Sequence, residues 1–114
     1  MSAVRQRMPR LEIPALTRLA KGAPCTLLIP GIHRPDPGNQ TSVWAHSNLL
    51  EHGHGAGTKS HDPFGAIACY WCHAAIDHGD TLTHEEKVRY MRQGMDRTLY
   101  YLFANNLLQV RGTR

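Results

Sequence analysis

The sequence lacks any hydrophobic run long enough to cross a membrane. No stretch approaches the roughly 18–20 consecutive apolar residues that a transmembrane helix needs. Residues 1–22 are basic, are interrupted by Pro9 and Pro14, and contain no continuous apolar core, so they do not have the pattern of a secretory signal. We therefore expect a cytoplasmic protein that does not associate with membranes.

Cysteine is also scarce. The chain has three cysteines, and this odd number, in the absence of an export signal, disfavours a disulfide-stabilised scaffold. No internal repeat is present. The length of 114 residues, with 41% apolar and 19% charged residues, is typical of one soluble domain. Clustered cysteines and histidines in such a protein indicate a metal site.

Acidic residues are few at both ends of the chain. Residues 1–21 carry a net charge of +4 and residues 82–114 a net charge of +3, whereas residues 22–81 carry −3. This central segment contains all three cysteines and seven of the eight histidines. Basic flanks favour a nucleic-acid partner, because phosphate contacts supply most non-specific affinity. The residues expected to contact phosphate are Arg18, Lys21, Lys59, Arg89 and Arg92.

The residue pattern predicts an α+β fold. We expect a short basic helix over residues 14–21, strands over residues 26–29, 41–46 and 66–68, and a long glycine-rich loop over residues 47–65. The run CYWCHAAID is expected to form a knuckle that continues into a helix, with Gly79 at the C-terminal cap.

A long C-terminal helix is expected after residue 82. Thr83 and Glu86 have the spacing of a capping box. Six apolar residues then recur at spacings of three and four, which predicts one buried stripe on a helix that runs to about residue 108 and is closed by Gly112: Val88, Met91, Met95, Leu99, Leu102 and Phe103. The expected organisation is a basic arm over residues 1–21, a core over residues 22–81 and this helix over residues 82–114, within a single domain.

Two short motifs predict a structural zinc site. Cys69 and Cys72 form a C-x-x-C knuckle, a spacing that lets two thiolates bind one ion. Cys25 and His33 flank the apolar turn TLLIPGI and can supply the two remaining ligands of a Cys₃His site. The alternative is that Cys25 is a small buried apolar residue and His33 a loop residue.

A second polar group is expected near the first. If Cys72 begins a helix, His73 and Asp77 lie at positions i and i+4 on one face and can hold a second metal ion. His46 ends the preceding strand and is a natural third member. Two strands followed by a helix, with histidines on the first strand and on the helix, outline a ββα-metal finger, in which a histidine activates water and a divalent ion polarises a phosphate.

The runs CTLLIPGIH, VWAH, GTK, D-x-x-G-A-x-AC-x-x-CH-x-x-ID and GM-x-RT resemble the prophage-encoded YbcO-type nucleases of the HNH-like, ββα-metal group. The resemblance covers residues 21–98. It implies a zinc-stabilised, metal-dependent endonuclease of a phage or prophage in a bacterial host, acting in DNA recombination or processing. It implies Cys25, Cys69 and Cys72 as zinc thiolates, with His33 where the family usually has a fourth cysteine. His46 and His73 take the two HNH histidine positions, and Asp77 that of the last metal ligand.

The chain departs from the HNH pattern at one position. These nucleases commonly carry an acid or a second histidine just before the strand histidine, where this chain has Ala45. The residues that can complete the catalytic metal site come from the long loop: Asn48, His52, His54 and His61. The catalytic ion is expected to be magnesium, manganese or a second zinc. His78 and His84 are expected at the surface.

Three other functions fit parts of the pattern. Cys69–His73 also matches the C-x-x-C-H attachment sequence of c-type haem, but haem attachment generally needs export. A thioredoxin-like redox motif would need a βαβ pattern, which the sequence lacks. A non-catalytic zinc module that binds DNA or a protein partner would need only the Cys₃His site and the basic ends. The sequence leaves homo-oligomerisation open.

Overall fold

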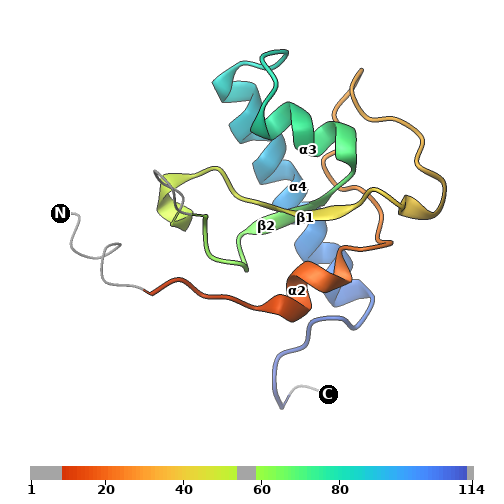
Figure 1. Ribbon diagram of the computed structural model, residues 1–114. Coiled ribbons are helices and arrows are strands. Elements are labelled where there is room, and N and C mark those ends of the chain that lie inside the picture. Colours follow the sequence, from red (N-terminus) through yellow and green to blue (C-terminus); the bar gives the residue numbers. More distant parts are fainter. Residues whose placement is uncertain (1–8, 54–58, 113–114) are drawn as a thin grey trace.

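The computed structural model describes residues 9–53 and 59–112 (Figure 1). Its helices and strands follow in the order α2 (Pro14–Leu19), β1 (Val43–His46), β2 (Gly65–Ala68), α3 (Tyr70–Asp77) and α4 (His84–Ala104), with short 3-10 helices at Pro37–Asn39 and Leu50–His52. The expected strand–strand–helix order and the long C-terminal helix are present in this mixed α/β structure.

The two strands form an antiparallel hairpin with a long connection. Val43 pairs with Ala68 and His46 with Gly65. Side chains alternate between the two faces of the sheet, as the period of a strand requires. Ala45, Ala66 and Ala68 join a cluster with Met91, whereas Trp44 and Ile67 join a second cluster on the other face. The sheet therefore separates two small apolar cores.

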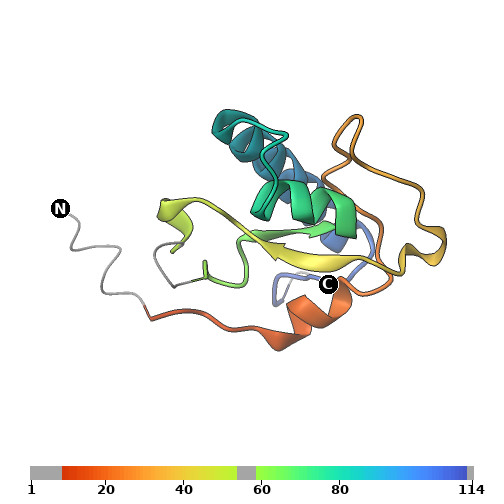
Figure 2. The ribbon, with the colours of Figure 1, turned by 45° about the horizontal axis from the view of Figure 1, so that its top comes forward.

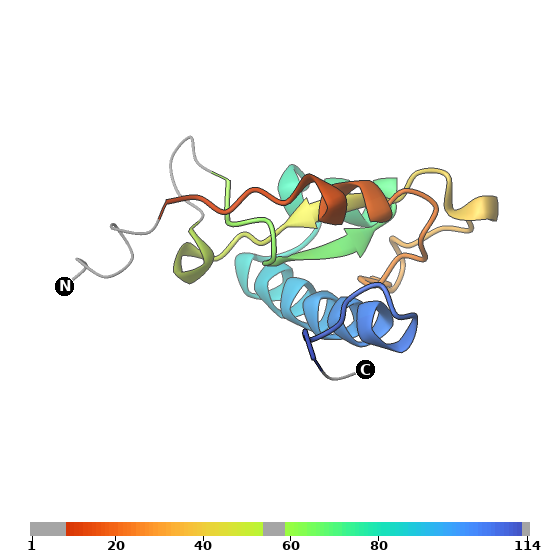
Figure 3. The same ribbon diagram turned by 90° about the horizontal axis from the view of Figure 1, so that it is seen from below.

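Each core is covered by a different helix. Figure 2 shows α3 on one side of the sheet and α2 on the other. In Figure 3 the sheet lies between α2 and α4, and α2 contacts β1 whereas α4 contacts β2. Because α4 is long, it contributes Met91 to the first core and Leu102 to the second.

The capping box at the start of α4 is confirmed. The Thr83 hydroxyl accepts a hydrogen bond from the Glu86 amide at 3.1 Å, and the Glu86 carboxylate accepts one from the Thr83 amide at 2.8 Å. These bonds satisfy two of the backbone groups that a helix leaves unpaired at its N-terminus. The expected knuckle that runs into α3 is also present, and the Gly79 amide closes that helix by donating to Ala74 O.

The predicted buried stripe of α4 is wrong in part. Leu99 and Phe103 are exposed, and the buried residues are Met91, Gly94, Thr98 and Leu102. Thr98 is buried because its hydroxyl lies 2.9 Å from that of Thr26 and accepts a hydrogen bond from the Ile67 amide. The hydrogen bonds of Thr98 and the small size of Gly94 therefore place these two residues on the buried face of α4, in place of Leu99 and Phe103.

The predicted strand over residues 26–29 is wrong. Thr26 donates to Ile67 O through both its amide and its hydroxyl, but Leu28 has a φ of 47°, which breaks an extended strand. The segment nevertheless buries Leu27 and Ile29 completely. Its apolar character thus reflects burial in the core and not sheet pairing.

The predicted end of α4 near residue 108 is also wrong. The helix ends at Ala104, and the amides of Leu107 and Leu108 both turn back to Leu102 O. Asn106 has a left-handed φ of 58°, a conformation that asparagine tolerates. The turn lets Leu108 pack against the second core. Within the described part of the chain, no helix has the length and apolar character needed to cross a membrane.

Replacing Gly65 with alanine should destabilise the protein by about 1–3 kcal/mol, the usual cost of overpacking a dense core. A Cβ atom on Gly65 would overlap the buried Trp44 ring and lie 2.8 Å from Ala45 O. Urea unfolding followed by circular dichroism measures the change. An unchanged midpoint would contradict the close packing of the two strands.

Candidate functional site

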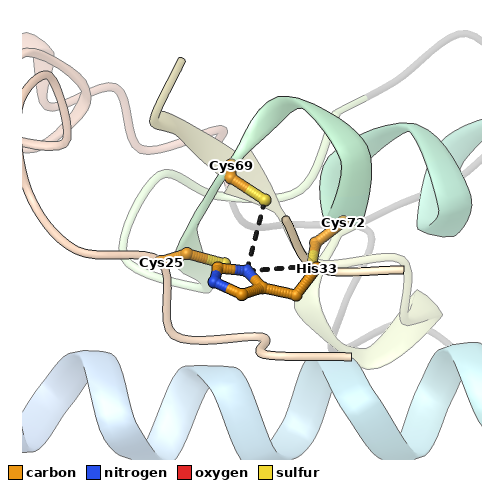
Figure 4. Close-up of side chains that lie close together, drawn as sticks. All are labelled: Cys25, His33, Cys69 and Cys72. Carbon is orange, nitrogen blue, oxygen red and sulfur yellow. Dashed lines mark hydrogen bonds between the residues drawn. The ribbon is translucent and has the colours of Figure 1, made fainter. Parts of the chain in front are cut away.

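Four potential metal ligands converge beside α3. The ligand atoms of Cys25, His33, Cys69 and Cys72 all lie within 4.8 Å of one another. Figure 4 shows the four side chains pointing toward one point, and His33 Nδ1 lies 3.5 Å from Cys69 Sγ and 3.8 Å from Cys72 Sγ. The cysteines are all free thiols. This cluster could hold a metal ion, and its Cys₃His composition is one that zinc accepts.

Local structure explains why these residues meet. Cys69 caps the N-terminus of α3 and Cys72 lies in its first turn, so both sulfurs point to the same side. Between Cys25 and His33 the chain reverses at Gly31, which has a left-handed φ of 78°. The amide of His33 bonds to Ile29 O at 2.9 Å and closes this turn.

The pKa values of the Cys25 and Cys72 thiols are shifted in opposite directions. A hydrogen bond from the Cys72 thiol lowers the pKa of Cys25 to about 4, against the opposing effect of burial. The same hydrogen bond, together with burial, raises the pKa of Cys72. One thiolate is therefore stabilised by a neighbouring proton, and a bound cation would take the place of that proton.

A second polar group surrounds His46 at the end of β1. His46 Nε2 lies 2.8 Å from Asp62 Oδ1, and Arg10 Nη2 donates to the same oxygen at 2.9 Å. Arg10 Nη2 also lies 3.4 Å from His46 Nε2. An ionised carboxylate can only accept, so the 2.8 Å contact assigns a hydrogen to Nε2, which leaves the lone pair of the neutral ring on Nδ1.

Asp62 is almost completely buried, with 4% of its surface exposed. Burial alone would raise its pKa. Hydrogen bonds from His46 and the Ile13 amide, reinforced by the charge of Arg10, outweigh burial and lower the pKa of Asp62 below its usual value. Asp62 is therefore ionised at neutral pH and holds the His46 ring in one orientation.

A third polar pair lies on α3. His73 Nε2 is 3.1 Å from Asp77 Oδ2, at the expected spacing of i and i+4, and both side chains reach solvent. Figures 1 and 2 show that α3 lies over one face of the sheet. Among the described residues, however, the Cys₃His cluster is the one group of three or more such ligands close enough for one ion. His46, His73 and Asp77 do not form a second such group.

The other predicted loop residues differ in their surroundings. His61 is buried, and its Nδ1 accepts a hydrogen bond from the Leu11 amide at 2.9 Å, so this nitrogen serves the structure. His52 Nδ1 lies 2.6 Å from the Ser47 hydroxyl. Asn48 Oδ1 is buried without a hydrogen-bond partner among the described residues. Lys59 is exposed, and His54 lies outside the described residues.

The predicted basic residues are exposed but lie apart. Arg18 belongs to α2 and Lys21 follows it, whereas Arg89 and Arg92 belong to α4, on the other side of the sheet (Figure 3). Arg92 pairs with Glu51 at 3.0 Å. These residues therefore do not form one continuous basic face. His78 and His84 are exposed, as expected.

Asp62, the carboxylate beside His46, is absent from the residues predicted from the sequence. It begins the run D-x-x-G-A, and β2 starts three residues later at Gly65, the partner of His46. In an antiparallel hairpin, residues just before the second strand lie beside residues that end the first. The strand register therefore places Asp62 beside His46, but this register is known only once the pairing of the two strands is known.

Residues 14–106 match the protein family described as "Putative nuclease YbcO". The chain belongs to this family. Membership supports a nuclease at that coarse level, of a kind associated with phages and prophages.

Two relatives and one solved structure agree with this assignment. The relatives, "Putative nuclease YbcO" of Escherichia coli K12 and of Enterobacteria phage 82, are each 42% identical over 62 residues, which are 54% of this chain and 62% of theirs. The match thus spans less than two thirds of each relative. A structure described as "a putative bacteriophage protein" from E. coli K-12 covers 79% of this chain and 98% of its own, with 26% identity and a TM-score of 0.61.

Metal binding by the four-residue cluster should require a nitrogen or sulfur ligand at position 33. His33→Ala should lose the ion, whereas His33→Cys should keep it, because zinc accepts either nitrogen or sulfur as the fourth ligand. Metal content per chain, measured by elemental analysis, and thermal unfolding with and without a chelator test this. His84→Ala is the matched control, since His84 is exposed on α4. Equal metal content in all three variants would contradict the site.

Proposed function

We propose that this protein is an HNH-like, metal-dependent DNA endonuclease of phage or prophage type, stabilised by zinc at Cys25, His33, Cys69 and Cys72. The observation that carries the proposal is the buried Asp62 carboxylate 2.8 Å from His46 at the end of the hairpin. Oriented histidine–carboxylate pairs are the usual means of holding a general base in one tautomer. The proposed role is in DNA recombination or processing.

His46 acts in this proposal as the general base. With Nε2–H donated to Asp62, the lone pair of Nδ1 accepts the proton of an attacking water molecule. Arg10, 28% exposed and bonded to Asp62, keeps the carboxylate charged. Asp62 acts through His46 in this proposal and is therefore a positioning residue.

His73 and Asp77 are the proposed protein ligands of the catalytic divalent ion. One imidazole nitrogen and one carboxylate oxygen lie 3.1 Å apart on the exposed side of α3. Two protein ligands are enough for magnesium, which retains several waters and also binds substrate phosphate. The unsatisfied, buried Asn48 Oδ1, two residues after His46, is a further oxygen of the kind that such ions accept. When bound, the ion would stabilise charge on the phosphate and on the leaving oxygen.

The departure at Ala45 is compatible with this mechanism. Ala45 is 1% exposed and belongs to the first apolar core, so an acid at that position would be buried among apolar side chains. The carboxylate beside His46 comes from Asp62, 16 residues further along the chain. The carboxylate that contacts His46 therefore comes from the segment before β2 and not from the position that precedes His46 in β1.

Substituting His46 with alanine should reduce magnesium- or manganese-dependent nicking of supercoiled plasmid by about 10²- to 10⁴-fold, the usual contribution of a positioned base. His73→Ala should also reduce nicking, because the catalytic ion loses one of its two proposed protein ligands. Gel electrophoresis of the plasmid forms measures the rate. His84→Ala, on the exposed start of α4, should keep full activity. If both variants nick like the wild type, the assignment fails, and DNA binding without nicking in the wild type would favour the non-catalytic zinc module.

Asp62→Asn should lower the nicking rate at saturating DNA while leaving DNA affinity within about twofold. Asparagine keeps the size of the side chain, but it removes the charge and can donate toward His46, so the ring is no longer held in one tautomer. Parallel rate and binding measurements separate the two effects. Equal losses of rate and affinity would assign Asp62 to structure alone.

A further inference from the structure

We infer that a hollow beside α3 binds an unpaired nucleotide of the DNA strand, so that the substrate class is DNA with single-stranded bases next to the cleavage site. The hollow, of about 440 Å³, lies between α3 and the segment that carries Gly31, Ile32 and Arg34. Pockets of this volume hold small organic groups. The inference rests on the nuclease function proposed above.

The chemistry of the hollow fits a base and its phosphate. Tyr70 is 62% exposed although it is a large aromatic residue, and its ring meets the Trp71 ring edge-on at a centroid distance of 5.9 Å. The Arg34 guanidinium lies 5.8 Å from the Trp71 ring centroid. Exposed aromatic rings beside arginine are how proteins bind single strands, since bases stack on the rings and cations hold the backbone.

The side chains that line the hollow include a cation and are compatible with an anion. Its lining includes Arg34 and His78, and no carboxylate from the described part of the chain. Arg34 has no ion pair with any described residue. It is held by the Trp71 ring, so its guanidinium remains available for a phosphate.

The Cys₃His cluster positions the backbone on both sides of the hollow. Arg34 directly follows His33, and Tyr70 and Trp71 lie between Cys69 and Cys72. The Tyr70 amide also donates to the Thr41 hydroxyl at 3.0 Å, which fixes the start of α3. Figure 1 shows the loop that carries residue 34 beside α3. The rings and the guanidinium are therefore held in place before any ligand binds, which lowers the entropic cost of binding.

The helix that lines the hollow also carries the proposed ligands of the catalytic ion. At 3.6 residues per turn, Tyr70 lies on the exposed side of α3 between Asp77 on one flank and Trp71 on the other. A strand whose base stacks on Tyr70 can thus continue toward His73 and Asp77 on the same helix. The geometry favours a strand that is locally unpaired, because a base in a duplex does not expose its face.

The test measures binding without cleavage. Fluorescence anisotropy with single-stranded oligothymidylate of about 16 nucleotides, and with a blunt duplex, is recorded without added magnesium or manganese. Tyr70→Ala should weaken single-strand binding roughly tenfold, within the range for one lost base stack, and should leave duplex binding nearly unchanged. Tyr70→Phe should bind like the wild type, because it keeps the ring.

Two controls make the result specific. Tyr100→Ala removes an exposed ring from α4, far from the hollow in sequence, and should change neither affinity. Arg34→Ala should reduce the slope of log affinity against log salt by about 0.7 on the single strand, the value for one phosphate contact. In the wild type, the single strand should also quench Trp71 fluorescence, whereas Trp44 is buried.

The outcomes separate this inference from the proposed function. Equal effects of Tyr70→Ala and Tyr100→Ala, or equal losses on single strand and duplex, would overturn the hollow as a nucleotide site. Plasmid nicking in the wild type would then leave the nuclease proposal standing. Conversely, Tyr70-dependent single-strand binding without nicking would support the hollow and count against the nuclease.

Discussion

The convergence of Cys25, His33, Cys69 and Cys72 is the constraint on which the rest of the structure depends. It joins a segment without regular structure, a loop and the start of α3, and it acts together with the burial of Leu27 and Ile29 in the first core. A structural zinc contributes about 10–16 kcal/mol in small zinc-binding peptides. That is comparable with the entire folding free energy of a typical domain. Zinc bound by the cluster would therefore offset much of the entropic cost of ordering the irregular backbone over residues 22–36.

The same cluster sets the positions of the polar groups around it. By fixing the start of α3, it fixes the direction in which His73 and Asp77 face, as well as the exposed rings of Tyr70 and Trp71. The sheet positions the second polar group: pairing of His46 with Gly65 brings Asp62 within hydrogen-bond distance of the imidazole. On α3, the cysteines of the cluster therefore alternate along the chain with exposed aromatic and polar residues.

Two errors of the sequence-based predictions arise from features that apolar spacing does not record. Residues 26–29 have the composition of a strand, and Leu99 and Phe103 have the spacing of a buried stripe, yet neither prediction is correct. The left-handed φ of Leu28 breaks the predicted strand, and buried hydrogen bonds of Thr98 change the buried face of α4. Thr26 and Thr98 bond to each other and to the backbone of Ile67, and this polar contact turns α4 so that Gly94 and Thr98 face the core. The spacing of apolar residues along the sequence does not indicate which polar side chains will form buried hydrogen bonds.

The sequence by itself determined the grouping of the cysteines with His33, the capping box of α4, the strand–strand–helix order and the family, because each depends on short-range spacing or on a specific motif. Only the tertiary structure decided that Asp62 meets His46, that the basic residues lie on different sides of the sheet, and that Tyr70, Trp71 and Arg34 border one hollow. These contacts join residues from separate segments. Their proximity follows from strand register and helix packing, which no local pattern specifies.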